Sequence, residues 1–246
     1  MSKKSSSKTN FLAQGTILVI ASFVAKAIGM IYRIPLTHIL GDDGNGYYST
    51  ANEIYTIILM ISSFSLPLAV SRLVAEREYA GEVKNSYKVL ICSLRFAAVT
   101  GGILSILTFL LGGVITKYVM GVELASYALR VLAPAIFLFA LTGVLRGFFQ
   151  GHGTMVPTAV SQIIEQIINA IVSVAGAYVM LQYGLKLGEK KGDAELGTAL
   201  AAAGGTFGTV ASVGVALLFM IVIYLGYRNG FKRRMKKDKT RRRESD

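Results

Sequence analysis

A stripe of polar side chains runs along residues 156–183, a segment that is otherwise strongly apolar. Its members recur at spacings of three and four residues: Thr158, Gln162, Glu165, Gln166, Asn169 and Ser173. At 3.6 residues per turn, these positions share one face of a helix. Carboxylate, amide and hydroxyl groups on one face are suited to lining a polar, water-filled cavity. The alternative is hydrogen bonding between neighbouring helices that only stabilises their packing.

Two cations, Lys26 and Arg33, lie in the first apolar segment and are seven residues apart, so they share a helix face. Pro35 follows them, and its missing backbone hydrogen bond is expected to bend or end the helix. An ionised side chain near the bilayer centre costs roughly 2.5–3.5 kcal/mol. Lys26, Arg95 and Glu165 should therefore face water, a partner or the interface. We interpret Lys26 and Arg33 as an anion-attracting wall; alternatively, Arg33 only extends to the outer interface.

Three further arginines lie within or near the ends of apolar segments, namely Arg72, Arg95 and Arg146. Each is interpreted first as an interfacial side chain, because a long cationic side chain can reach the headgroup region from inside a span. Each is also a candidate for contact with a lipid headgroup or a phosphate.

Residues that could form a catalytic centre are missing from the sequence. The two histidines, His38 and His152, are expected at opposite membrane faces, and HExxH, nucleophile-elbow and P-loop motifs are absent. The single cysteine, Cys92, excludes an intrachain disulfide and a thiolate metal cluster. The sequence therefore predicts neither an enzyme nor a metal or cofactor site, and it leaves a coupling ion open.

The polar residues are set in a chain whose composition is typical of a membrane protein. Of its 246 residues, 53% are hydrophobic and 16% are charged, and the mean hydropathy is +0.54. Because the charges cluster between long apolar runs, the fold class predicted is an all-α integral membrane protein with six transmembrane helices. The expected segments are 11–40, 47–74, 89–119, 125–149, 156–183 and 197–227.

The distribution of basic residues predicts the orientation. Ten of the 26 Lys and Arg residues lie from Arg228 onward, and the loops on that side are the more basic. By the positive-inside rule, both termini are cytoplasmic and the protein is a multi-pass cell-membrane protein. Residues 1–10 form a cytoplasmic N-terminus, 11–227 the six-helix lobe, and 228–246 a basic cytoplasmic tail. This tail indicates anionic lipid, and not nucleic acid, as its partner.

The last apolar segment is rich in small residues. Gly204 and Gly208 form a small-xxx-small pair, which permits close approach of two helices. We interpret this pair as a packing contact and not as a ligand site.

Four stretches carry a family resemblance. Residues 26–36 (KAIGMIYRIPL), 40–48 (LGDDGNGYY), 65–72 (SLPLAVSR) and 145–165 (LRGFFQGHGTMVPTAVSQIIE) resemble the polysaccharide-biosynthesis and stage V sporulation protein B proteins. These belong to the multidrug/oligosaccharidyl-lipid/polysaccharide (MOP) exporter superfamily, which includes the lipid II flippases. The resemblance extends through all six segments.

The resemblance implies a mechanism and a partner. Family members have two lobes around a cavity that opens alternately to each face and carries a lipid-linked sugar, with cations holding its diphosphate. By this resemblance Lys26 and Arg33 are the counterparts of first-helix cations. The polar stripe supplies the other expected cavity residues, Glu165, Gln162, Gln166 and Asn169. The chain resembles one lobe, an N-terminal half ending in the stretch that would link the lobes, so a second lobe of six to eight helices is expected.

The function expected is that of a flippase or exporter lobe for a lipid-linked cell-wall or polysaccharide precursor such as lipid II, with membrane lipids as further partners. One alternative is an ion-coupled multidrug exporter of the same superfamily, with Glu165 as the coupling carboxylate. Another is a membrane protein that does not transport, either a remnant or an assembly partner.

Overall fold

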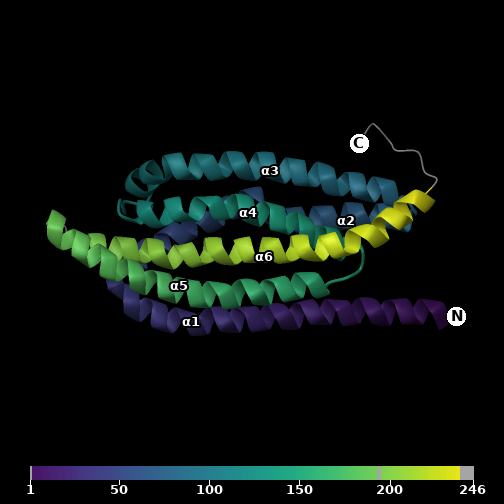
Figure 1. Cartoon of the computed structure of the whole chain (residues 1–246), viewed down its shortest axis with the longest axis horizontal. Helices are drawn as coiled ribbons and strands as arrows, with labels where there is room; N and C mark the ends of the chain where they lie inside the picture. The colour runs from purple at the N-terminus through teal and green to yellow at the C-terminus, as the bar shows by residue number, and fades with distance from the viewer. Residues whose placement is uncertain (1, 193–194, 239–246) are drawn as a thin grey trace.

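The computed structural model describes residues 2–192 and 195–238, and every regular element in those ranges is helical (Figure 1). In chain order they are α1 (Ser2–Ser62), α2 (Leu66–Tyr79), α3 (Val83–Val114), the π-helical turn η1 (Ile115–Val119), α4 (Ala125–Gly151), α5 (Val156–Lys191) and α6 (Leu196–Lys237). Five described stretches are long and apolar enough to cross a membrane: Gln14–Tyr79, Val83–Val119, Ala125–Gly151, Val156–Lys190 and Leu196–Lys237. The prediction of an all-helical fold with long apolar helices is confirmed.

α1 changes direction at Gly41, whose φ of 65° and ψ of −172° lie in a region that is essentially restricted to glycine. Gly41 divides α1 into a first limb, residues 2–40, and a second limb, residues 42–62. The helix does not end at Pro35, one of the two outcomes expected there, because helical dihedral angles continue through that residue. A proline removes one backbone hydrogen bond, which a packed helix tolerates, whereas the Gly41 conformation ends the helical path outright.

The segment predicted at 47–74 is shared between two helices. The second limb ends at Ser62, a turn follows, and α2 begins at Leu66 with Pro67 in its first turn, where a proline is tolerated. α2 packs closely on α4. A Cβ at Gly147 would lie 2.5 Å from the carbonyl oxygen of Pro67, so this position has room only for glycine.

α5 and α6 approach each other at backbone distance. A Cβ at Gly204 would lie 2.2 Å from the carbonyl oxygen of Gly176, and a Cβ at Gly208 would lie 2.1 Å from Oγ of Ser173. The prediction that the small residues of the last segment serve close packing is confirmed.

α4 is the most deeply buried helix and lies between α3 and α6 (Figure 1). By contrast, α3 carries exposed apolar side chains at helical spacing along one face: Phe96, Val99, Ile103, Ile106, Leu110 and Val114. A continuous apolar stripe of this kind is suited to contact with acyl chains, because lipid, unlike water, does not penalise its exposure.

The start of α1 and the end of α6 lie at the same end of the bundle (Figure 1). α6 has 42 residues, which corresponds to about 63 Å at 1.5 Å per residue and exceeds a hydrocarbon core of about 30 Å. Residues 228–237, predicted as the start of a tail, continue this helix and are tied to the bundle by buried Phe231. The predicted tail from residue 239 onward lies outside the described residues.

Candidate functional site

The polar face of α5 contacts three other helices. Oγ of Ser22, on the first limb of α1, donates a hydrogen bond to Gln162 over 3.2 Å. On α4, Nε2 of Gln150 donates to Thr158 over 3.4 Å. Toward the other end of the stripe, Oγ1 of Thr209 on α6 donates to Oδ1 of Asn169 over 3.5 Å. Within α5, Oγ of Ser173 donates to the same oxygen over 2.9 Å. Part of the predicted stripe therefore serves helix–helix hydrogen bonding, the alternative that the sequence left open.

Glu165, the only carboxylate of the stripe, forms an ion pair with Arg146 of α4. Nη2 of Arg146 lies 2.7 Å from Oε2 of Glu165, and Nε donates to Oγ of Ser161 over 2.9 Å. The side chains are only 8% and 15% exposed. Arg146 therefore differs from the interfacial side chain expected, because its charge is neutralised within the bundle. Its role as a phosphate or headgroup contact stays a prediction.

Asn169 joins α5 to two neighbouring helices. Its Nδ2 donates to the hydroxyl of Tyr32, on the first limb of α1, over 2.9 Å. Its Oδ1 accepts from Ser173 and, at 3.5 Å, from Thr209 of α6. Asn169 is 8% exposed, and both the nitrogen and the oxygen of its amide form hydrogen bonds. The structure therefore supports a role in positioning α5 against its neighbouring helices.

Lys26 and Arg33 lie in a different environment. Both are exposed, and within residues 2–192 and 195–238 neither forms an ion pair. They line an open cavity of about 520 Å³ together with Gln166 and Gly29. A Cβ at Gly29 would lie 3.4 Å from Oε1 of Gln166, so the glycine leaves space for that amide beside the two cations.

Arg33 also lines a second open cavity of about 550 Å³ between the two limbs of α1. Its other lining residues come from the second limb: Ser49, Asn52, Glu53, Thr56 and Ile57. We refer to the two cavities that share Arg33 as the Arg33 groove. Sequence reasoning missed the contribution of the second limb, although the spacing of Ser49, Asn52 and Thr56 is the same helical signal that revealed the α5 stripe.

The remaining predicted cations lie outside the Arg33 groove. Arg72 on α2 and Arg95 on α3 are exposed, and neither lines either cavity. The structure thus brings Lys26, Arg33 and Gln166 together, pairs Glu165 with Arg146, and leaves Arg72 and Arg95 apart. Among the described residues, no group of three or more His, Cys, Asp or Glu side chains could hold a metal ion.

The class of protein follows from comparison with known proteins. The family described as polysaccharide biosynthesis protein matches residues 11–243. The chain belongs to this family, and the resemblance inferred from residues 26–72 and 145–165 is confirmed. Its long apolar helices and membrane relatives make it a multi-pass membrane protein.

Two relatives from Bacillus subtilis (strain 168) are particularly informative. Stage V sporulation protein B is 28% identical over 217 residues, which cover 88% of this chain and 39% of that protein. Lipid II flippase MurJ is 29% identical over 180 residues, which cover 70% of this chain and 33% of that protein. The chain therefore spans well under half the length of these relatives.

The fold also matches a solved transporter. The outward-facing conformation of a multidrug resistance MATE family transporter of the MOP superfamily superposes with a TM-score of 0.72 at 18% identity. The match covers 91% of this chain and 46% of that one. The helical arrangement in Figure 1 is thus that of part of a MATE-type transporter.

Proposed function

We propose that the chain forms one lobe of a membrane flippase or exporter for a lipid-linked cell-wall or polysaccharide precursor, and that it is not an enzyme. The observation that carries this proposal is the Arg33 groove, in which Lys26 and Arg33 are exposed cations without an ion-pair partner among the described residues. The lipid II flippase and the solved transporter named above support a transport function.

The groove has the chemistry that a lipid diphosphate requires. Lys26 and Arg33 are seven residues apart, about 10 Å along the helix, so their side chains can converge on one diphosphate. Phe23 and Met30 line the same cavity and are 76% and 68% exposed, which offers apolar surface to a polyprenyl chain. Gln166, Asn52 and Glu53 add hydrogen-bonding groups suited to a sugar.

The Arg146–Glu165 pair favours an anionic substrate over a cationic drug. A multidrug exporter that couples transport to a cation through Glu165 needs a carboxylate that is free to bind it. Here the carboxylate accepts a charge-assisted hydrogen bond from Arg146 over 2.7 Å. The cations of the groove, by contrast, are available.

We further propose that Gly41 divides α1 into two crossings, so that the lobe has six spans and both termini are cytoplasmic. The two cavities of the groove are open, and a second lobe of six to eight helices would supply the missing wall. The lobe alone is then expected to bind the precursor weakly and not to move it across a bilayer.

Binding of undecaprenyl diphosphate to the chain in nanodiscs, followed by native mass spectrometry, tests the proposal. Charge-assisted hydrogen bonds contribute roughly 1.5–3 kcal/mol each, so Lys26→Ala and Arg33→Ala should each weaken binding by about tenfold or more. Lys186→Ala, which removes an exposed charge of α5 outside the groove, is the matched control. Equal affinity of all three variants and the wild type would refute the groove as the diphosphate site.

A transport assay tests the requirement for a second lobe. Liposomes that contain the chain as a demonstrated monomer should show no translocation of a fluorescent lipid diphosphate, and addition of a second lobe should restore it. Translocation by the monomer would disprove the half-transporter proposal.

A further inference from the structure

A second charged cluster lies at the end of the bundle where α6 ends, and neither the predicted site nor the proposed function uses it. Nε2 of His152, just after α4, lies 3.3 Å from Oε1 of Glu78 in α2. The two side chains are only 12% and 14% exposed. Both of these atoms are buried, and neither has a hydrogen-bond partner. Two buried polar atoms that lie 3.3 Å apart and form no hydrogen bond require an explanation.

The hydrogen bond formed by the other ring nitrogen of His152, Nδ1, determines which ring atoms carry hydrogen. Nδ1 of His152 lies 2.8 Å from the carbonyl oxygen of Phe148. A carbonyl oxygen only accepts, so Nδ1 must carry the hydrogen of this bond. In a neutral ring Nε2 would then present a lone pair to the Glu78 carboxylate, which repels it. One additional proton between Nε2 and Oε1 converts this repulsion into a charge-assisted hydrogen bond.

The surroundings favour a site that holds this proton. Arg234 of α6 pairs with the other oxygen of Glu78, which keeps the carboxylate in place. Phe231 of α6 and Phe148 of α4 pack on the imidazole, with ring centroids 5.2 and 4.4 Å away. Of the titratable groups on adjoining helices, Tyr87 contacts Phe231 and Tyr224 contacts Phe148. Arg228 lines the same cavity of about 200 Å³ that reaches His152.

We propose that His152 and Glu78 form a proton-binding site that fastens α2, the end of α4 and the extension of α6 to one another. With the proton bound, the imidazolium bridges Phe148 and Glu78 while Arg234 holds the second carboxylate oxygen. Release of the proton to solvent leaves the neutral imidazole facing a carboxylate, and the His152–Glu78 contact opens. The proposal concerns the protonation of this chain and does not depend on the proposed substrate.

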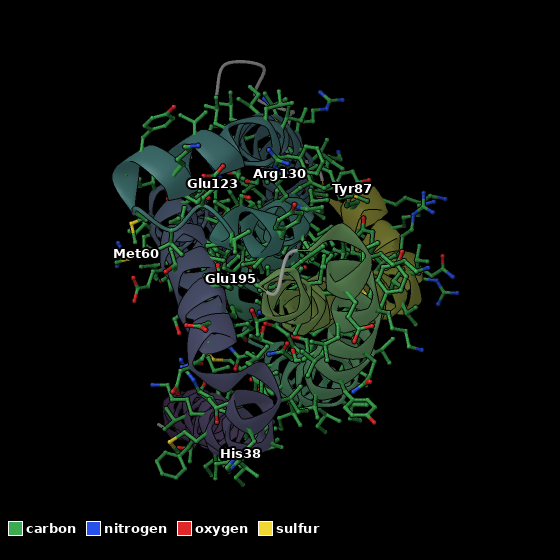
Figure 2. The ribbon with its side chains drawn as sticks, turned by 90° about the vertical axis from the view of Figure 1, so that its left-hand side faces the viewer. His38, Met60, Tyr87, Glu123, Arg130 and Glu195 are labelled. Carbon is green, nitrogen blue, oxygen red and sulfur yellow. The ribbon has the colours of Figure 1, made fainter. Side chains whose placement is uncertain are left out.

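Histidine NMR can read the site directly, because the chain has only two histidines. His38 is exposed on α1 and forms no ion pair among the described residues. Figure 2 shows it on the opposite side of the molecule from Tyr87, which contacts the Phe231 ring beside His152. His38 is therefore an internal control, and the two signals are assigned with His38→Gln.

In the full chain in nanodiscs, we expect both ring nitrogens of His152 to carry a hydrogen while its contact with Glu78 is closed. In Glu78→Gln, protonation of Nε2 should be lost while the His38 signal is unchanged. An unprotonated Nε2 in the wild-type chain would overturn the proposal without the use of any variant. A protonated Nε2 that persists in folded Glu78→Gln would also overturn it.

The distance between α2 and the extension of α6 tests whether the bound proton holds these two helices together. In a Cys92→Ser background, spin labels at Tyr79→Cys and Arg233→Cys report the separation of α2 from the extension of α6. The distance distribution should broaden as the pH is raised, and His152→Gln should remove this pH dependence. A distribution that responds to pH equally in both proteins would contradict a role for the proton in docking the extension.

Discussion

Arg146 of α4 and Glu165 of α5 form a buried ion pair, with Nη2 2.7 Å from Oε2. The residues are 19 positions apart, separated by the end of α4, a tight turn and the start of α5, and their side chains meet in the interior. The pair removes the charge of Glu165 from the polar face of α5 and leaves Lys26 and Arg33 as the exposed cations of the Arg33 groove. The groove therefore presents net positive charge beside Gln166.

Arg146→Gln is expected to destabilise the protein strongly, since removal of one partner leaves Glu165 as a buried, uncompensated charge. The usual cost is roughly 3–5 kcal/mol, and thermal unfolding in detergent measures it. Lys186→Gln, at an exposed position of α5, serves as the control. The double variant Arg146→Gln/Glu165→Gln should recover part of the loss. Equal melting temperatures for the Arg146 and Lys186 variants would show that the pair contributes nothing.

Gly208→Ala should separate α5 from α6. Its Cβ would lie 2.1 Å from Oγ of Ser173, and overpacking of this kind typically costs about 1–3 kcal/mol. Gly214→Ala, on the same helix, is a matched substitution, because its Cβ would lie an ordinary 3.8 Å from Leu138. Thermal unfolding should show a loss for the first variant only. A Gly208 variant as stable as the Gly214 variant would rule out the close contact.

Gly41→Ala should destabilise the junction of the two limbs of α1. The φ of 65° and ψ of −172° strain any residue with a Cβ, at a cost of about 1–3 kcal/mol. Gly46→Ala, five residues further along the helix, meets no atom within 4 Å and lacks a positive φ. That control should be neutral or stabilising, because alanine favours helix. A stable Gly41→Ala protein would indicate that the limbs are not joined by this kink.

Reporter fusions before residue 2 and after residue 238 should both report the cytoplasm. The start of α1 and the end of α6 lie at one end of the bundle, where the basic residues of α6 gather (Figure 1). A cytoplasmic fluorescent protein and a periplasm-active phosphatase distinguish the two sides. Reporters on opposite sides of the membrane would mean an odd number of crossings and would contradict the proposed six spans.

Periodicity in the sequence predicts which residues share a face, and this part of the interpretation agrees with the structure. The α5 stripe and the small residues Gly204 and Gly208 do face neighbouring helices. Periodicity does not identify the partner across that face, because the partner depends on how helices distant in sequence are arranged. For this reason the pairing of Glu165 with Arg146 was missed, although both residues had been singled out.

Helix breaks and helix ends were also hard to predict. Pro35 and Gly41 are both helix breakers by composition, but only the glycine adopts a positive φ, and only tertiary packing selects between them. In the sequence, residues 228–237 have the composition of a basic tail and do not indicate a continued helix. Phe231 packs on Tyr87, Phe148 and His152, and Met235 also packs against the core. Two apolar residues among so many cations are a weak signal.

The backbone contact between α5 and α6 limits how the molecule can rearrange. At Gly176 and Gly204 the two main chains have no side-chain layer between them, so neither helix can rotate or slide without collision. We expect the two helices to travel as one rigid pair that carries the polar face of α5 with it. Under the proposed transport function, any change of shape in this lobe is expected at the kink at Gly41 and at the turn before Pro67, and the Arg33 groove would widen or narrow as α1 moves against that pair.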